Sequence, residues 1–216
     1  MIARSRLLTA ALLVVALAGC RSKGDIVLDE GIGITALRTS CPATGIPDYT
    51  GDITTFTRAG ATDAAALDVT ASITNLRTQC NDTGAKVYST SSFDVLARRS
   101  DVRGARTVQL PYFVTVLRGR SAVISKRIGT VTLQFADGQE RAQARGTGAA
   151  YIDKAEATLP EDIRQQITRK RRAGDSDAAT DPLSRPEIRQ AVNRATFEVL
   201  VGFQLSQDQL SYNATR

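Results

Sequence analysis

Apolar and polar residues alternate with a period of two through the middle of this chain. The clearest stretch places Leu67, Val69, Ala71 and Ile73 between polar neighbours, a pattern typical of a β-strand with one buried face. The threonine-rich segment 50–57 precedes it and is its predicted hairpin partner. The same pattern predicts further strands at residues 87–98, 107–117, 122–135, 139–145 and 197–205.

Turn sequences separate the predicted strands and indicate the fold class. Asp137-Gly138 is a strong hairpin signal, and residues 118–121 form a second turn. Segment 107–117 is apolar on both faces from Tyr112 onward, which is typical of a central strand. Many short strands at nearly regular spacing favour a mainly β protein. We expect an antiparallel β-sandwich of about seven strands, for which an immunoglobulin-like architecture is one option.

The pattern changes near Thr158, where a helix is predicted. Thr158 and Glu161 have the spacing of a capping box, and Pro160 would lie in the first turn. Gly174 would end the helix, because glycine readily adopts the backbone conformation that follows a helix C-terminus. A helix is therefore expected between about residues 159 and 173.

A second helix is expected shortly afterwards. Ser184 and Glu187 repeat the capping-box spacing and predict a helix at residues 187–194. Ile163 and Ile167 give the first helix a narrow apolar side, enough to dock it on another element. One or two helices near the C-terminus are thus expected before the last strand.

The first twenty residues have the features of an export signal. Arg4 and Arg6 precede an apolar run at residues 7–17, which is too short to span a bilayer. The run ends in Leu17-Ala18-Gly19-Cys20, which resembles the lipobox of bacterial lipoproteins. The resemblance implies cleavage before Cys20 and acylation of that cysteine. Arg21 is not the aspartate that retains many such proteins in the inner membrane, so the resemblance implies the outer membrane, facing the periplasm.

The resemblance also suggests how the chain is divided. Residues 1–19 would be a signal peptide, residues 20–49 a lipidated tether, and residues 50–216 a single β-sandwich domain with a helical insertion at about 159–195. The overall pattern is similar to uncharacterised envelope lipoproteins of alphaproteobacteria, which implies a location but no activity. A lipoprotein carries several acyl chains, enough for stable attachment to a membrane.

Composition argues against several classes of function. Cleavage after residue 19 would remove Arg4 and Arg6, leaving 26 basic and 22 acidic residues and a net charge of +4. This modest charge does not indicate a nucleic-acid-binding protein. The chain contains no histidine, the usual general base of hydrolases and the commonest metal ligand. We therefore expect no enzymatic activity, no cofactor and no metal.

Two cysteines remain once Cys20 is assigned to a lipid. In an oxidising compartment the default expectation for Cys41 and Cys80 is one disulfide. Cys41 precedes the first strand of the predicted hairpin and Cys80 follows the second, so both would lie at the same end of the sheet. Two free thiols or a redox pair are the alternatives, although the spacing is not Cys-x-x-Cys.

The densest basic cluster is Arg169, Lys170, Arg171 and Arg172 at the predicted end of the first helix. Cations at a helix C-terminus interact favourably with the helix dipole, which explains the cluster without a partner. The alternative is contact with an anionic partner at the membrane surface, where each basic residue contributes on the order of 1 kcal/mol.

A second basic cluster lies between two predicted strands. Arg98, Arg99, Arg103 and Arg106 alternate there with acidic residues such as Asp101. Mixed charges of this kind are typical of a solubilising loop, and no further role is expected.

The sequence therefore predicts where the protein acts more sharply than what it does. We expect a non-enzymatic, lipid-anchored envelope protein that is a structural or accessory component of an envelope assembly. Its partners would be the membrane, through the anchor, and an envelope protein. The alternative is a periplasmic binding module for a lipid or glycan. A protein partner predicts an exposed apolar or arginine-rimmed patch, whereas a ligand predicts a deep apolar cavity.

Overall fold

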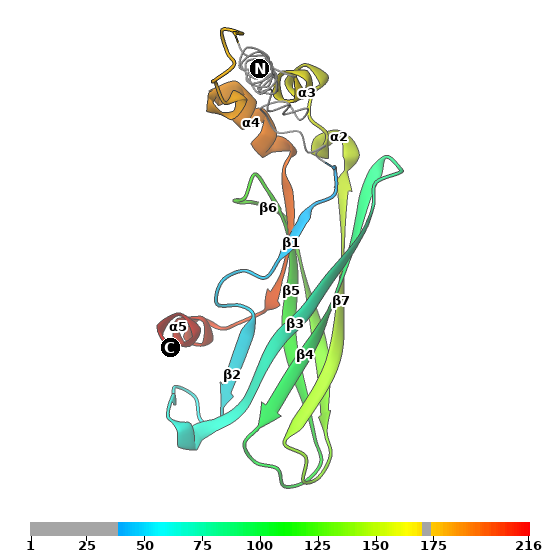
Figure 1. Cartoon of the computed structure of the whole chain (residues 1–216). Helices are drawn as coiled ribbons and strands as arrows, with labels where there is room; N and C mark the ends of the chain where they lie inside the picture. The colour runs from blue at the N-terminus through cyan, green and yellow to red at the C-terminus, as the bar shows by residue number, and fades with distance from the viewer. Residues whose placement is uncertain (1–38, 170–173) are drawn as a thin grey trace, which may run out of the picture.

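A computed structural model describes residues 39–169 and 174–216 as two four-stranded β-sheets packed face to face, with helices at one end (Figure 1). We call them sheet A and sheet B. In order across each sheet, sheet A holds β1 (Ala43–Gly45), β8 (Phe197–Phe203), β5 (Arg106–Arg118) and β6 (Ala122–Phe135), and sheet B holds β2 (Asp52–Phe56), β3 (Leu67–Asn81), β4 (Lys86–Arg99) and β7 (Arg141–Asp153). Every pairing is antiparallel except β1 with β8. The predicted antiparallel β-sandwich is confirmed.

The inward residues of both sheets form the main core. Alternation on β4 buries Phe93 and Val95, and β6 and β8 contribute Leu133 and Val201, each at most 1% exposed. Burying a side chain of this size stabilises a fold by about 1.5–3 kcal/mol. The period of two in the sequence therefore reports the two-layer packing directly.

Glycines in β7 allow the two sheets to approach closely. A Cβ atom on Gly146 would lie 2.2 Å from Cζ of Phe93, and one on Gly148 would lie 2.3 Å from Cγ2 of Val114. The inward positions of β7 from Ala142 to Ala150 are glycine and alanine, so this part of the strand shows little alternation in sequence. This is why the predicted strand ends at residue 145, whereas β7 continues to Asp153.

Within residues 39–169 and 174–216, four α-helices accompany the sandwich: α2 (Lys154–Ala157), α3 (Glu161–Thr168), α4 (Pro186–Ala195) and α5 (Gln207–Thr215). Short 3-10 turns are η2 (Ala64–Ala66) and η3 (Pro182–Ser184). Figure 1 shows α2, α3 and α4 together at one end of the sandwich, which we call the helical pole, while α5 lies beside β2. Among the described residues, no helix is long and apolar enough to cross a membrane.

The helical pole has a small core of its own. Ile163 and Ile167 of α3 pack with Ile188 and Val192 of α4, away from the main core between the sheets. The apolar side predicted for the first helix is thus used, and its docking surface is the second helix. The helices are held chiefly by each other at one end of the sheets.

The predicted capping boxes are wrong. Pro160 is the N-cap of α3 and Arg185 that of α4, and neither makes a side-chain cap. Instead, the Thr158 hydroxyl donates to the Lys154 carbonyl, and the Ser184 hydroxyl donates to a carbonyl in η3's own turn. The capping box that does form opens α5, a helix that the sequence did not predict.

In α5 the capping residues are Ser206 and Gln209. The Ser206 hydroxyl accepts from the Gln209 N–H at 3.2 Å, and the Gln209 side chain accepts from the Ser206 N–H at 2.9 Å. The first helix also ends earlier than expected, since α3 stops at Thr168 with Arg169 as its extended C-cap. Residues 170–173 lie outside the described part of the chain.

The sandwich begins before residue 50, inside the segment predicted to be a tether. Residues 43–45 form β1, which pairs in parallel with β8. Cys41, just before β1, forms a disulfide with Cys80 of β3, with a Cα–Cα distance of 6.0 Å. The predicted disulfide is confirmed, and it links sheet A to sheet B, because β1 belongs to one and β3 to the other.

Candidate functional site

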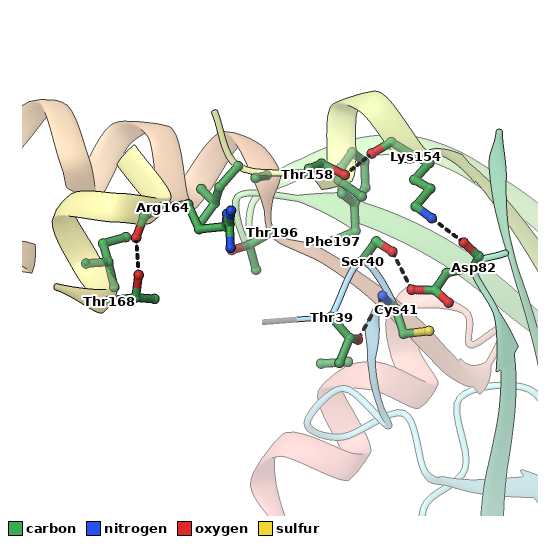
Figure 2. A pocket seen from close by; sticks show the side chains of 15 residues that line it. Thr39, Ser40, Cys41, Asp82, Lys154, Thr158, Arg164, Thr168, Thr196 and Phe197 are labelled. Carbon is green, nitrogen blue, oxygen red and sulfur yellow. Dashed lines mark hydrogen bonds between the residues drawn. The ribbon is translucent and has the colours of Figure 1, made fainter. Parts of the chain in front are cut away.

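A cleft of about 480 Å³ opens at the helical pole (Figure 2). Its walls come from the segment Thr39–Ala43, from α2 and α3, and from the start of β8. The cleft lies between sheet and helices, and its volume falls within the range of small-molecule sites, about 300–1,000 Å³. It is the first of two candidate sites.

The walls of the cleft are mostly apolar. Six residues with aliphatic or aromatic side chains line it: Ala43, Ala157, Leu159, Ile167, Ala195 and Phe197. Three of its four threonines add to them, because each hydroxyl donates to the carbonyl four residues earlier in its own helical turn: Thr158 at 2.6 Å, Thr168 at 2.9 Å and Thr196 at 2.7 Å. Their hydroxyl hydrogens are thus already used within the protein, which lowers the polarity of the walls.

A polar group of three residues lies at one side of the cleft. Lys154 Nζ donates to the main-chain carbonyl of Asp82 at 2.5 Å, and the Ser40 hydroxyl donates to the Asp82 carboxylate at 2.8 Å (Figure 2). Within the described part of the chain, no carboxylate lies within 4.0 Å of the Lys154 ammonium group. An ammonium group has three donors, so Lys154 retains the capacity to bind an anion.

The second cation at the cleft is neutralised by the chain itself. Arg164 donates to both carboxylate oxygens of Glu161 at 2.6 and 2.7 Å. This contact, together with one from Gln165, lowers the pKa of Glu161 below its ordinary value. Arg164 therefore lines the cleft, but its charge is already paired with Glu161.

The second candidate site is the first half of β6, residues 122–128, which we call the exposed β6 segment. All seven residues are exposed, and Val123, Ile124 and Ile128 are 63%, 54% and 56% accessible to solvent. β6 is the last strand of sheet A and hydrogen-bonds only to β5, so its other edge is unpaired within the described chain. Large exposed apolar residues on a free strand edge are unusual for a monomeric protein.

The apolar surface of this segment continues onto β5. Ile128 is opposite Phe113, and Val123 is opposite Leu117 across a bulge that adds one residue to β6. Lys126 Nζ lies 4.9 Å from the centre of the Phe113 ring, a cation–π contact. The exposed β6 segment thus combines apolar side chains with basic ones, and β6 contains no acidic residue.

The basic cluster at the end of α3 is described only at Arg169. Its guanidinium donates to both Asp177 carboxylate oxygens at 2.5 and 2.6 Å, and this contact raises the pKa of Arg169. The charge of Arg169 is therefore met within the chain. Lys170, Arg171 and Arg172 lie outside the described residues, so contact of the cluster with an anionic partner stays a prediction.

In the arginine cluster between β4 and β5, Arg98 and Arg103 are exposed as expected of a solubilising loop, but Arg99 is not. Arg99 is 1% exposed, and its guanidinium donates to four main-chain carbonyls, those of Val102, Gly104, Ala136 and Gln139, at 2.6 to 2.8 Å. It also lies 5.3 Å from the centre of the Phe135 ring. Arg99 holds the β4–β5 and β6–β7 loops together at the end opposite the helical pole.

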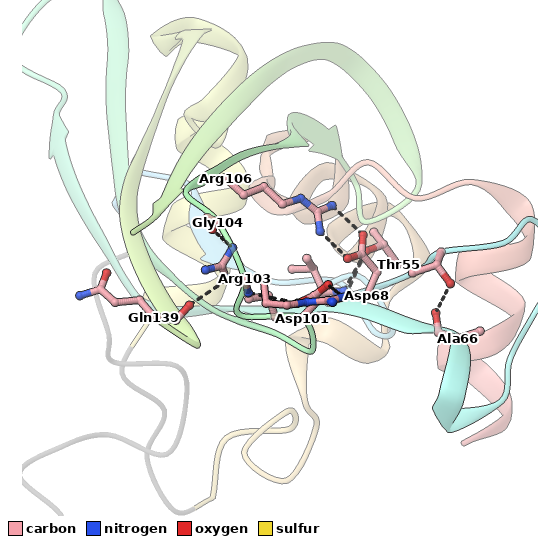
Figure 3. Close-up of polar contacts among 11 residues, drawn as sticks. Thr55, Ala66, Asp68, Asp101, Arg103, Gly104, Arg106 and Gln139 are labelled. Atoms are coloured by element: carbon pink, nitrogen blue, oxygen red, sulfur yellow. Dashed lines mark hydrogen bonds and ion pairs between the residues drawn. The ribbon is translucent and has the colours of Figure 1, made fainter. Parts of the chain in front are cut away.

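Two ion pairs surround that end of the sandwich (Figure 3). Arg106 forms a two-pronged contact with Asp68 at 2.5 and 2.7 Å, which lowers the pKa of Asp68 and raises that of Arg106. Arg103 likewise holds Asp101, whose pKa is lowered chiefly by that side chain. The first pair joins β3 of sheet B to β5 of sheet A, and the second lies within the β4–β5 loop. Both carboxylates are thus engaged by guanidinium groups of the chain itself.

The chain was compared with protein-family models, with curated proteins and with solved structures, and none of the three comparisons found a match. Among the described residues, no three His, Cys, Asp or Glu side chains are grouped as metal ligands. Cys20 and the rest of the lipobox lie outside the described residues. The two candidate sites therefore rest on geometry alone.

The sequence missed both sites in part. Ser40, Asp82 and Lys154 are separated by 42 and 72 residues, so nothing local associates them. The exposed β6 segment did leave a signal: Val123 and Ile124 are adjacent apolar residues, which breaks the alternation that β6 shows from Val131 onward. Consecutive residues of a strand point to opposite faces, so two adjacent apolar residues place apolar side chains on both faces of the sheet.

Proposed function

We propose that this protein is a non-enzymatic, lipid-anchored envelope protein that serves as an accessory component of an envelope assembly. The lipobox-like sequence ending at Cys20 supports the anchor and the location, and the internal disulfide is consistent with an oxidising compartment. Partner binding through the exposed β6 segment is the role that the geometry supports best.

A single observation carries this proposal: seven consecutive residues of an edge strand are exposed, and three of them are large and apolar. An unpaired strand edge offers main-chain donors and acceptors to an extended segment of another chain, a recognised mode of protein binding. The bound segment would extend sheet A as an additional strand, and its side chains would contact Val123, Ile124 and Ile128. The segment thus offers both hydrogen bonds and apolar contact.

Charge indicates the chemistry of the partner. Lys126 and Arg127 lie in the middle of the segment without an ion pair among the described residues, and Arg120 at its start is 3.9 Å from its nearest acid, Glu198. A second copy of the chain would bring the basic pair close to its own equivalent, which costs energy. An extended segment with acidic residues complements the charge, so the proposed partner is an envelope protein with such a segment.

Site-specific crosslinking in living cells tests this proposal. A photoreactive phenylalanine replaces Ile124 in the full lipoprotein, and a control protein carries it at Thr132, an exposed position in the second half of the same strand. We expect one discrete adduct from position 124 and at least fivefold less from position 132. Equal capture from both positions, or capture of abundant bystanders alone, would contradict the proposed surface.

A further inference from the structure

We propose that the cleft at the helical pole binds a single-chain anionic lipid, a long-chain fatty carboxylate, with its acyl chain along the apolar walls and its carboxylate at Lys154. This inference does not depend on the partner surface, because it concerns a different part of the molecule. It assigns a ligand class to a cavity that the proposed accessory role leaves unused.

The chemistry of the walls favours an acyl chain over a sugar. Ala157, Ile167 and Phe197 offer apolar contact, and burying an acyl chain against them removes apolar surface from water, which favours binding. The hydroxyls of Thr158, Thr168 and Thr196 already donate to carbonyls of their own turns. Sugar recognition needs donors and acceptors along the whole ligand, whereas the polar groups of this cleft with remaining capacity gather at one side, around Ser40, Asp82 and Lys154.

The charge at the polar side favours a carboxylate head. Lys154 is bonded to a neutral carbonyl oxygen of Asp82, and Arg164 is paired with Glu161. The Asp82 carboxylate accepts from Ser40 and forms no ion pair with Lys154 within 4.0 Å. Lys154 is therefore the cation of the cleft that is able to gain most from an added anion, through a charge-assisted hydrogen bond.

The wall opposite the helices is fixed by a covalent bond. Cys41 lines the cleft, and its disulfide with Cys80 attaches the segment Thr39–Ala43 to sheet B. A wall that is held in place before the ligand arrives lowers the entropy that binding has to remove. The cleft is thus largely formed in the absence of ligand.

Titration calorimetry with hexadecanoate tests the proposal on the full chain carrying Cys20→Ser, so that no acyl group of the protein competes. We expect one site per chain. Lys154→Met should weaken hexadecanoate binding by about tenfold, the value of one charge-assisted contact near a surface. The same substitution should change the affinity for hexadecanol, which lacks the charge, by less than threefold. Lys126→Met, a lysine on the exposed β6 segment, is the control and should leave both affinities unchanged.

Two further variants separate a ligand effect from a folding effect. Ala157→Phe should fill the cleft and abolish binding of both probes, with thermal unfolding recorded to show that the variant is folded. Ala105→Phe makes the same substitution at an exposed position of the β4–β5 loop, away from the cleft, and binding should change by less than twofold. If Ala157→Phe does not fold, the Lys154→Met comparison decides alone.

Comparison with the acylated protein identifies the source of the ligand. Binding by both forms supports a free fatty acid as the occupant. Binding by the Cys20→Ser protein alone also supports the proposal and identifies the protein's own anchor chain as the resident ligand. Absence of hexadecanoate binding, or binding that Lys154→Met and a folded Ala157→Phe leave unchanged, would overturn it.

Discussion

Cys41 and Cys80 join the two sheets of the sandwich at a Cα–Cα distance of 6.0 Å. Cys41 lies just before β1 of sheet A, and Cys80 lies near the end of β3 in sheet B. The bond therefore joins the two sheets beside the cleft. The bond also brings a segment that was predicted to be a free tether into the folded domain.

Removal of this disulfide is expected to destabilise the protein substantially. The bond closes a loop with a sequence separation of 39 residues, for which the chain-entropy model gives roughly 4 kcal/mol. The double variant Cys41→Ser, Cys80→Ser should therefore lose about 3–4 kcal/mol of unfolding free energy in urea titrations. The parent protein measured with reductant should lose a similar amount. A loss below about 1 kcal/mol would show that the sheets are held together without the bond.

Arg99 should be critical for stability although its neighbour Arg98 is not. Arg99→Met would remove four hydrogen bonds to main-chain carbonyls, and only those of Val102 and Ala136 have main-chain N–H donors as well, so the loss is expected to cost about 3 kcal/mol. The Arg98 side chain is 65% exposed and pairs only with Glu140, so Arg98→Met should cost less than about 0.5 kcal/mol. Equal unfolding free energies for the two variants would contradict the structural role of Arg99.

The contact between Asp68 and Arg106 predicts a pH dependence of stability. Because the pKa of folded Asp68 lies below its ordinary value, the contact stabilises the protein above about pH 4 and is lost as pH falls through the folded pKa. Asp68→Asn should lower the unfolding free energy at pH 7 by about 1 kcal/mol, because the Asp68 side chain is 15% exposed and that of Arg106 is 42% exposed. The difference from the parent should shrink as pH falls through the folded pKa of Asp68 and vanish below it. Asp48→Asn, an exposed acid, is the control, and a difference that persists in acid would count against the ion pair.

The predicted lipid anchor has a direct test. Cys20→Ser should abolish incorporation of radiolabelled palmitate and release the protein from the membrane fraction, because a single signal peptide run at residues 7–17 is too short to anchor it. Cys41→Ser, at a cysteine of the disulfide, should leave the label in place. Retention of the Cys20→Ser protein in membranes would refute the lipobox interpretation.

The fold was predictable from sequence wherever apolar and polar residues alternate along a strand. Residues such as Val69 and Ala71, or Val131 and Leu133, report burial directly through their period of two. Alternation predicted only the first part of β7, because Gly146 and Gly148 face the core and have no side chain that would continue the apolar pattern. Prediction also failed on capping boxes, since the spacing occurs three times and only Ser206 with Gln209 uses it.

The candidate sites were less predictable, for a physical reason. Arg98 and Arg99 are adjacent and chemically identical, and only the strand's inward and outward alternation separates a buried donor from a surface charge. The cleft depends on Lys154 reaching the carbonyl of Asp82, a contact between distant segments that no local pattern encodes. Tertiary packing, not residue type, creates both features.

Charge reversal on the exposed β6 segment tests the central claim, partner binding by this strand, most directly. The measurement is the yield of the adduct formed by a photoreactive phenylalanine at position 124, with and without Lys126→Glu and Arg127→Glu in the same chain. Both basic residues are exposed, so the variant should fold and lose no more than about 1 kcal/mol of unfolding free energy, the value of the cation–π contact between Lys126 and Phe113. The proposed acidic partner predicts a loss of adduct of at least fivefold. An undiminished yield of the same adduct from the folded variant would contradict the claim.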